Sequence, residues 1–292
     1  MSFPEAPGPG TPASAGGSGD SSQHRAPEVD PVFAWVSDPE LVAIYDVENT
    51  GGWDHEFYLE LAQELGAEHV ADIGCGTGVF GILLAEHGIA VTGVDPSAAM
   101  IDVARGRTPA DRAEAGSAEP TPPPRWIHGF ADQLPAGVAD LAVMEGHVAQ
   151  YFLTRADWEA VLSHAFSALR PGGHLAFEVR NPAALELDDW DPESTRETQP
   201  HPDGGEFTSW LEIVKVTEDP AEGALITARS HNILPDARTI IAEETLRYRP
   251  LPALRETLSA AGFREVRIWG DWDREELTED SPEMIFLVQK PG

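Results

Sequence analysis

The chain has 292 residues, 41% of them hydrophobic, which is enough apolar material for one large domain or two small ones. Its formal net charge of −31 argues against nucleic acid and anionic membranes as partners, because both are negatively charged and would be repelled. The sequence contains no apolar run long enough for a membrane span, and its single cysteine, Cys75, cannot form an internal disulfide, so we expect a cytoplasmic protein.

The first part of the chain is expected to lack structure. Residues 1–28 consist mostly of proline, glycine, serine and alanine, and they cannot bury enough apolar surface to offset the entropy lost on ordering. We therefore predict a disordered tail at 1–28, followed by one domain at 29–292. This domain is predicted to open with a helical lid at 29–68, in which the helical pattern runs from about Pro39 to Leu65.

Strands and helices are expected to alternate between His69 and Arg180. Apolar runs predict strands at 69–73, 90–94, 125–128, 139–144 and 173–179. Helical patterns lie between them at 78–87, 97–105 and 155–169, and Ser97 is a plausible helix cap. The segment 106–124, rich in proline, alanine and acid, is predicted to be a surface loop. This order is typical of a parallel sheet covered by helices on both faces.

The pattern changes after Arg180. Alternating, β-rich runs at 206–217, 223–233 and 238–249 are joined by short turns, which predicts an antiparallel meander inserted at 181–250. A helix is expected at 251–261, ended by Gly262, and two further strands are expected at 263–270 and 284–289.

The most informative motif is the loop that follows the first predicted strand. Gly74, Gly76 and Gly78 have no β-carbon, so the backbone can turn sharply there and a ligand can lie against the main chain. The next helix opens directly after this loop, with unpaired N–H groups at its start. The following strand ends in Asp95, a carboxylate in position to accept hydrogen bonds from a ribose diol. Together these features predict a site for a nucleoside cofactor.

The identity of the nucleoside depends on the glycine spacing. The dinucleotide fingerprint has the order G-x-G-x-x-G, but this chain has Val79 at the third position and glycines in the order G-x-G-x-G. A nicotinamide-dependent oxidoreductase on a similar sheet is therefore only the alternative enzyme class. A further alternative is a protein that binds the cofactor without turnover.

At this point the chain resembles the class I methyltransferases that use S-adenosylmethionine (SAM). Their motifs are an acidic residue two positions before a G-x-G-x-G loop, matched by Asp72, and an acidic residue that ends the next strand, matched by Asp95. The resemblance covers roughly residues 41–290. It implies an α/β fold with a doubly wound, seven-stranded, mostly parallel sheet, an antiparallel C-terminal strand and the inserted meander as a substrate cap.

The resemblance also implies an activity and a partner. The chain would transfer a methyl group from SAM to an oxygen or nitrogen of a small molecule by direct in-line displacement, as a monomer or homodimer. The cofactor would be held by Asp72, Gly74, Cys75, Gly76, Gly78, Asp95, Pro96, Phe130, Ala131, Asp132, Glu145 and Gly146. Many relatives carry an acidic residue for the adenine where this chain has Phe130. Either Phe130 stacks near the adenine while Ala131 or Asp132 supplies a polar contact, or backbone groups alone hold it.

The acceptor side is expected after the fourth and fifth strands of the parallel sheet, because ligands lie at the carboxyl ends of such strands. His147 is the candidate general base, since an unperturbed imidazole titrates near neutrality. The alternative is a histidine that only packs or forms hydrogen bonds near SAM. The substrate pocket would contain Tyr45, Tyr58, Gln150, Glu178, Arg180 and His231, with Trp210, Trp269 and Trp272 on its far wall. No spacing of histidine, cysteine and acidic residues predicts a metal site.

Overall fold

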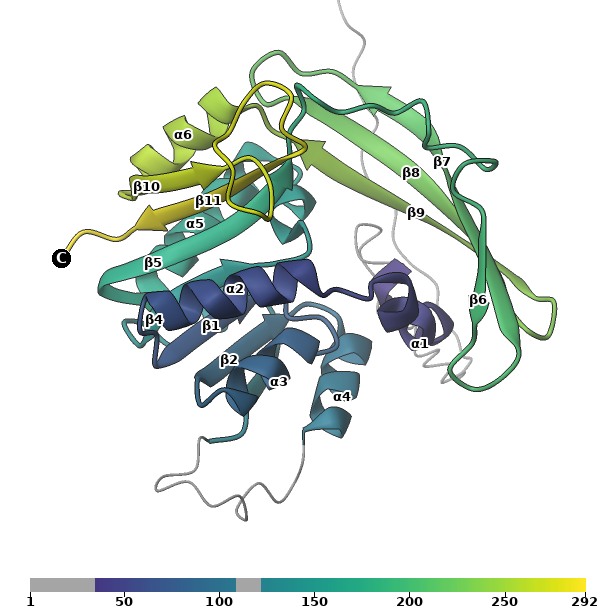
Figure 1. The fold of residues 1–292 in the computed structure, drawn as a ribbon, viewed down its shortest axis with the longest axis horizontal. Helices are drawn as coiled ribbons and strands as arrows, with labels where there is room; N and C mark the ends of the chain where they lie inside the picture. The colour runs from purple at the N-terminus through teal and green to yellow at the C-terminus, as the bar shows by residue number, and fades with distance from the viewer. Residues whose placement is uncertain (1–34, 109–121) are drawn as a thin grey trace, which may run out of the picture.

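The computed structural model describes residues 35–108 and 122–292, which form two β-sheets with helices around the larger one (Figure 1). The predicted tail at 1–28 and most of the predicted loop at 106–124 lie outside these residues. The elements are, in chain order, η2 (Trp35–Ser37), α1 (Pro39–Glu48), α2 (Trp53–Glu64), β1 (His69–Ile73), α3 (Val79–Glu86), β2 (Ala90–Asp95), α4 (Ala98–Arg107), β3 (Arg125–His128), η3 (Ala131–Gln133), β4 (Ala139–Met144), η4 (Val148–Tyr151), α5 (Arg155–Ala168), β5 (Leu169–Arg180), β6 (Glu197–Pro200), β7 (Glu206–Thr217), β8 (Ala224–Ile233), β9 (Thr239–Tyr248), α6 (Leu251–Ala260), β10 (Arg264–Trp269) and β11 (Glu283–Gln289).

The larger sheet confirms the predicted fold class. Its seven strands have the order β10-β11-β5-β4-β1-β2-β3. The strands from β3 across to β5 run parallel, whereas β11 is antiparallel to both β5 and β10. The direction of the strand order reverses between β1 and β4, where Asp72 is opposite Val143. In open α/β sheets, ligands bind at the carboxyl ends of the strands beside such a reversal.

Helices cover both faces of this sheet, so each strand contributes alternate side chains to two cores. Along β4, Ala142 and Met144 face the core under α5 and α6, while Leu141 and Val143 face the core under α2 and α3. The indole N–H of Trp158 in α5 donates a hydrogen bond to Thr257 in α6 at 2.9 Å, inside the first core. The two cores fix the strand ends on which the site is built.

The second sheet, called the cap sheet below, contains β6, β7, β8 and β9 in that order, with antiparallel neighbours throughout. Three of these strands match the predicted meander. The fourth, β6, was not predicted, because it is a four-residue edge strand that ends in Pro200 and lacks a long alternating pattern. Figure 1 shows the cap sheet reaching outward from the main sheet with α1 beside it. Leu41 and Ile44 of α1 pack against Phe207 of the cap sheet.

The predicted helical region at 39–65 is interrupted. α1 begins after Asp38, whose carboxylate accepts the Glu40 N–H at 2.9 Å. The chain then turns through Gly51 and Gly52 at φ values of 59° and 124°, which side chains rarely adopt, and α2 follows. This turn brings the first residues of α2 beside the glycine loop. The predicted cap at Ser97 is confirmed, since its hydroxyl accepts the Met100 N–H at the start of α4. None of the helices in the described ranges is both long and apolar enough to cross a membrane.

Candidate active site

The three glycines in the loop between β1 and α3 are needed for different structural reasons. A β-carbon added to Gly74 would lie 2.5 Å from the Val148 side chain, and one added to Gly78 would lie 2.8 Å from Ala104. A β-carbon on Gly76 would meet only the ring of Tyr45, at 3.9 Å. Gly74 and Gly78 are therefore required by packing beneath the loop. Gly76 leaves open space above the main chain, as a ligand cradle requires.

Asp95 ties the glycine loop to the end of β2. Its carboxylate accepts the Gly76 N–H at 3.0 Å and the Ser97 N–H at 2.8 Å. Burial raises the pKa of Asp95, although these two backbone hydrogen bonds act in the opposite direction. A carboxylate has room for about four hydrogen-bond donors, so two ribose hydroxyls can still be accommodated.

Two further carboxyl groups are buried close to the loop. Burial, together with the charge of Asp95, raises the pKa of Asp72 to about 7. Burial also raises the pKa of Glu145 well above its usual value, and the charges of Asp72 and Asp54 add to this. Oε1 of Glu145 is buried and accepts no hydrogen bond within the described chain, although the His55 ring lies near it, as described below. A nearby cation stabilises the ionised form of such buried carboxyl groups. The ammonium group of SAM fits that requirement, and the space above Gly76 fits the rest of its amino-acid end.

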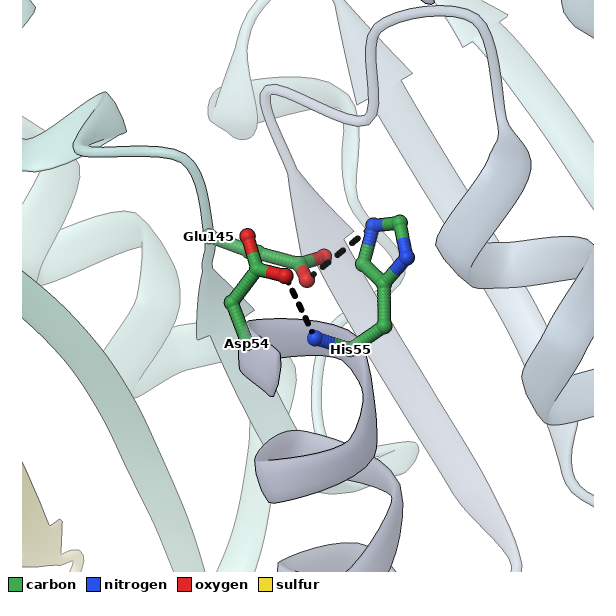
Figure 2. A group of neighbouring side chains, drawn as sticks. All are labelled: Asp54, His55 and Glu145. Atoms are coloured by element: carbon green, nitrogen blue, oxygen red, sulfur yellow. Dashed lines mark hydrogen bonds and ion pairs between the residues drawn. The ribbon is translucent and has the colours of Figure 1, made fainter. Parts of the chain in front are cut away.

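A cluster that sequence reasoning missed lies where α2 begins. Figure 2 shows Asp54, His55 and Glu145 pointing toward one another. Nε2 of His55 is 3.3 Å from Oε1 of Glu145, and the Asp54 carboxylate accepts the backbone N–H of His55 at 2.8 Å. One potential ligand atom from each of the three residues lies within 4.8 Å of the others, so the group could hold a divalent cation or an organic ammonium group. The sequence gives no signal for it, because Glu145 is distant from the other two along the chain.

A second group of buried polar side chains lies at the ends of β4, β5 and β11. Glu178 accepts the hydroxyl of Tyr58 and the backbone N–H of His147, the latter at 2.6 Å. Nε2 of His147 lies 2.9 Å from a carboxylate oxygen of Glu283. Burial raises the pKa of Glu178, while the charge of His147 opposes this. This group is the strongest candidate for proton transfer in the described residues.

One cavity joins these groups to the cap sheet. Its volume is about 690 Å³, within the range of small-molecule sites. Trp210 of the cap sheet lines this cavity, its ring stacked on that of its cross-strand neighbour His231 at 4.9 Å between ring centres and with the Arg196 guanidinium over it at 4.3 Å. This packing fixes the Trp210 ring as an aromatic part of the wall of the cavity that the glycine loop also lines.

The predicted site residues divide into two sets. Those that line the cavity are Tyr45, Asp72, Gly74, Cys75, Gly76, Glu145, Gly146, His147, Glu178 and Arg180. Those that do not line it are Gly78, Asp95, Pro96, Phe130, Ala131, Asp132, Tyr58, Gln150 and His231.

Several of the second set support the wall from behind. Tyr58 is fully buried and holds Glu178, and Gln150 is fully buried and accepts the Arg180 N–H at 3.3 Å. His231 is paired with Glu212 at 3.2 Å and stacks on Trp210. Phe130 is 58% exposed at the end of β3. Of the three tryptophans expected at the far wall, Trp210 and Trp272 line the cavity and Trp269 packs in a core.

Comparison with known proteins gives a consistent family. A family model described as a methyltransferase domain matches residues 70–173. A trans-aconitate 2-methyltransferase of Paracidovorax citrulli is 39% identical over 116 residues, which cover 39% of this chain and 39% of that relative. A ubiquinone/menaquinone biosynthesis C-methyltransferase of Rubrivivax gelatinosus is 30% identical over 226 residues, which cover 75% of this chain and 71% of that relative.

Solved structures share the fold. The CcbJ methyltransferase of Streptomyces caelestis superposes with a TM-score of 0.67 at 18% identity, covering 88% of this chain and 98% of its own. The sugar N-methyltransferase KedS8 of Streptoalloteichus superposes with a TM-score of 0.65 at 17% identity, covering 85% of this chain and 93% of its own. At these identities the superpositions establish the fold alone.

Proposed function

We propose, from the premise that this chain belongs to the class I SAM-dependent methyltransferases, that it methylates a nitrogen of a small cationic amine. Membership of this family makes the chain a methyltransferase with SAM as its methyl donor. The sequence left oxygen and nitrogen open as acceptor atoms. The cavity favours nitrogen, because of its charge.

The single observation that carries this proposal is the excess of carboxyl groups around the cavity. Arg180 is the only arginine or lysine among the lining residues in the described chain. The acidic lining residues are Asp46, Glu48, Asp54, Asp72, Glu145, Glu178, Glu243, Glu244 and Glu283. A cavity lined by one sign of charge concentrates ligands of the opposite sign and repels its own. A protonated amine is attracted to such a site, whereas a carboxylate or phenolate acceptor is repelled.

The solved structures are compatible with this acceptor class. KedS8 is described as a sugar N-methyltransferase and CalS10, from Micromonospora echinaspora, as an amino pentose methyltransferase. Both share the fold with this chain at less than one fifth sequence identity, so they support the proposal only by analogy. The main support for an amine acceptor is the charge of the cavity.

The residues of the chain have to align two reactants rather than form covalent bonds. When bound, SAM supplies a methyl group on a positively charged sulfur, which a nucleophile can displace in line. Asp95 would accept the ribose hydroxyls, and Asp72 with Glu145 would hold the ammonium group. His147, beside Glu145 at the end of β4, would take the proton that the acceptor nitrogen must lose. The aromatic wall at Trp210 would exclude water from the far side of the acceptor.

Two measurements test the proposal. Calorimetry with S-adenosylhomocysteine tests the cofactor site. If the protein does not bind this compound at high micromolar concentrations, SAM is not its cofactor. Transfer of labelled methyl from SAM is then measured to benzylamine, glucosamine and putrescine, with benzyl alcohol and glucose as matched oxygen acceptors. We expect transfer to at least one amine and none to the alcohols. Transfer to the alcohols alone would refute an amine as the acceptor. Tight binding of S-adenosylhomocysteine with no transfer to any acceptor would favour a protein without turnover.

The remaining expectations from the sequence stay proposals. We propose a cytoplasmic location on the ground of the single cysteine, and a monomer or homodimer as the working state. The net charge of −31 argues against both nucleic acid and an anionic membrane as partners.

A further inference from the structure

His147 has an unusual backbone conformation. Its φ of 60° and ψ of 23° lie in the left-handed region, directly after Gly146 at φ 72°. Within the described residues only Ala237 and Arg274 are other non-glycine residues with positive φ. Such a conformation is sterically disfavoured for a residue with a β-carbon and persists where the surrounding structure imposes it, often at functional sites.

Two carboxylates from different strands hold this residue. The buried Glu178 of β5 accepts the backbone N–H of His147, and Glu283, at the start of β11, contacts its ring. The carbonyl of His147 accepts the Gln150 N–H at 2.9 Å, which closes the turn. The His147 and Glu283 side chains are 20% and 12% exposed, and both residues line the cavity. The ring is thus fixed in place and also open to a ligand.

The contact with Glu283 determines which ring nitrogen can act as a base. An ionised carboxylate only accepts hydrogen bonds, so this contact requires the proton of a neutral His147 ring to be on Nε2 when Glu283 is ionised. Nδ1 then carries the free lone pair. The second carboxylate oxygen of Glu283 has no hydrogen-bond partner among the described residues, so the contact with His147 is the only hydrogen bond of this carboxylate there.

We propose that Glu283 is a positioning residue that holds His147 with Nε2 protonated, so that Nδ1 takes the proton of the acceptor amine. This inference rests on the proposed amine methyltransferase function. The protonated amine first passes one N–H proton to Nδ1, which leaves a lone pair on the acceptor nitrogen, and the Glu283 carboxylate stabilises the resulting imidazolium until it releases a proton to water. The nitrogen lone pair then forms the bond to the methyl carbon, while the electron pair of the broken carbon–sulfur bond stays on sulfur.

The first test is spectroscopic and needs no acceptor. In protein labelled with ¹⁵N-histidine, two-bond nitrogen–proton spectra distinguish the two neutral tautomers, and His147→Ala identifies the signal. We expect His147 to be protonated at Nε2 in the parent and to become a mixture of tautomers in Glu283→Gln, whose amide can donate as well as accept. A parent signal protonated at Nδ1 would overturn the proposal.

The second test is kinetic and uses SAM with the best amine of the acceptor panel. Glu283→Gln should lower kcat by roughly tenfold to a hundredfold, with acceptor KM changed by less than about threefold. Glu283→Asp should recover a large part of the loss. In a His147→Ala background the Glu283→Gln change should have almost no further effect, because the residue acts through His147. An undiminished effect in that background would overturn the proposal.

Two controls separate this proposal from the others. Glu279→Gln removes the same charge from the exposed connection before β11, outside the cavity, and should leave kcat unchanged. S-adenosylhomocysteine should bind Glu283→Gln and the parent within about twofold. If the parent transfers methyl to no amine, the proposed function fails, and the tautomer measurement still decides whether Glu283 positions the ring. If the parent is active and Glu283→Gln is equally active, only the present inference fails.

Discussion

Replacement of Asp72 by asparagine should separate the stability of the unliganded protein from its affinity for the cofactor. The pKa of Asp72 is raised from 3.8 in the unfolded chain to about 7 in the folded protein, chiefly by burial. As the pH rises, the unfolded chain therefore loses this proton first. The folded, unliganded protein loses stability between about pH 4 and pH 7, and below pH 4 the effect vanishes because both states keep the proton.

The magnitude follows from the size of the shift. About three pKa units at 1.36 kcal/mol each correspond to about 4 kcal/mol of lost stability above pH 7. An asparagine side chain carries no charge, so Asp72→Asn should recover roughly half or more of this at pH 8 and little at pH 4. For a domain of this size the gain corresponds to a rise in Tm of roughly 4–16 °C at pH 8.

Cofactor binding should change in the opposite direction. Loss of a charge-assisted hydrogen bond to the ammonium group costs about 1.5–3 kcal/mol, so S-adenosylhomocysteine should bind roughly ten to a hundred times more weakly. Urea denaturation at pH 4 and pH 8 measures the first effect and calorimetry the second.

The exposed Asp280 supplies the control, since Asp280→Asn tests whether removing any charge from so acidic a chain is stabilising. Equal gains in the two variants at pH 8 would refute the burial argument, and unchanged binding in Asp72→Asn would refute the ammonium contact.

Three further outcomes follow from the glycine loop and Asp95. In urea denaturation Gly74→Ala should destabilise the protein by roughly 1–3 kcal/mol more than Gly76→Ala, because the new β-carbon at position 74 meets Val148. If adding Val148→Ala to Gly74→Ala restores no stability, this explanation is wrong. Gly76→Ala should instead lower the affinity for S-adenosylhomocysteine in calorimetry, and a variant that binds as tightly as the parent would remove Gly76 from the cradle. Asp95→Ala should weaken the same binding roughly tenfold to several hundredfold, since two hydrogen bonds to the ribose are lost; full affinity would contradict the ribose assignment.

The cofactor half of the site could be predicted because its signals are local. Asp72 and the three glycines lie in one loop, and Asp95 ends the next strand, which pairs directly with the first. Spacing along the sequence therefore fixes spacing in the fold. Even here the sequence could not tell that Gly74 and Gly78 are required by packing while Gly76 faces open space, since that depends on Val148 and Ala104 from other segments.

The acceptor half could not be predicted in the same way. His147 and Glu283 meet because β11 enters the sheet antiparallel to β5, with Glu283 opposite Arg180. One residue of slip in that register would turn the Glu283 side chain to the other face of the sheet. No pattern in the sequence fixes that register. His55 likewise reaches Glu145 only because the chain turns at two glycines before α2, and the prediction of a helical region from about Pro39 to Leu65 did not specify that turn.

The charge of the chain has a meaning in the structure that its total does not convey. The net value of −31 speaks to solubility and to excluded partners, because exposed charges are screened over about 8–10 Å at ordinary ionic strength. The carboxyls around the cavity are different, since burial removes that screening and raises the pKa values of Asp72, Glu145 and Glu178. A cation that enters the cavity relieves this cost, while an anion increases it. Burial of acid at one cavity, rather than the amount of acid in the chain, is therefore the basis for expecting an amine.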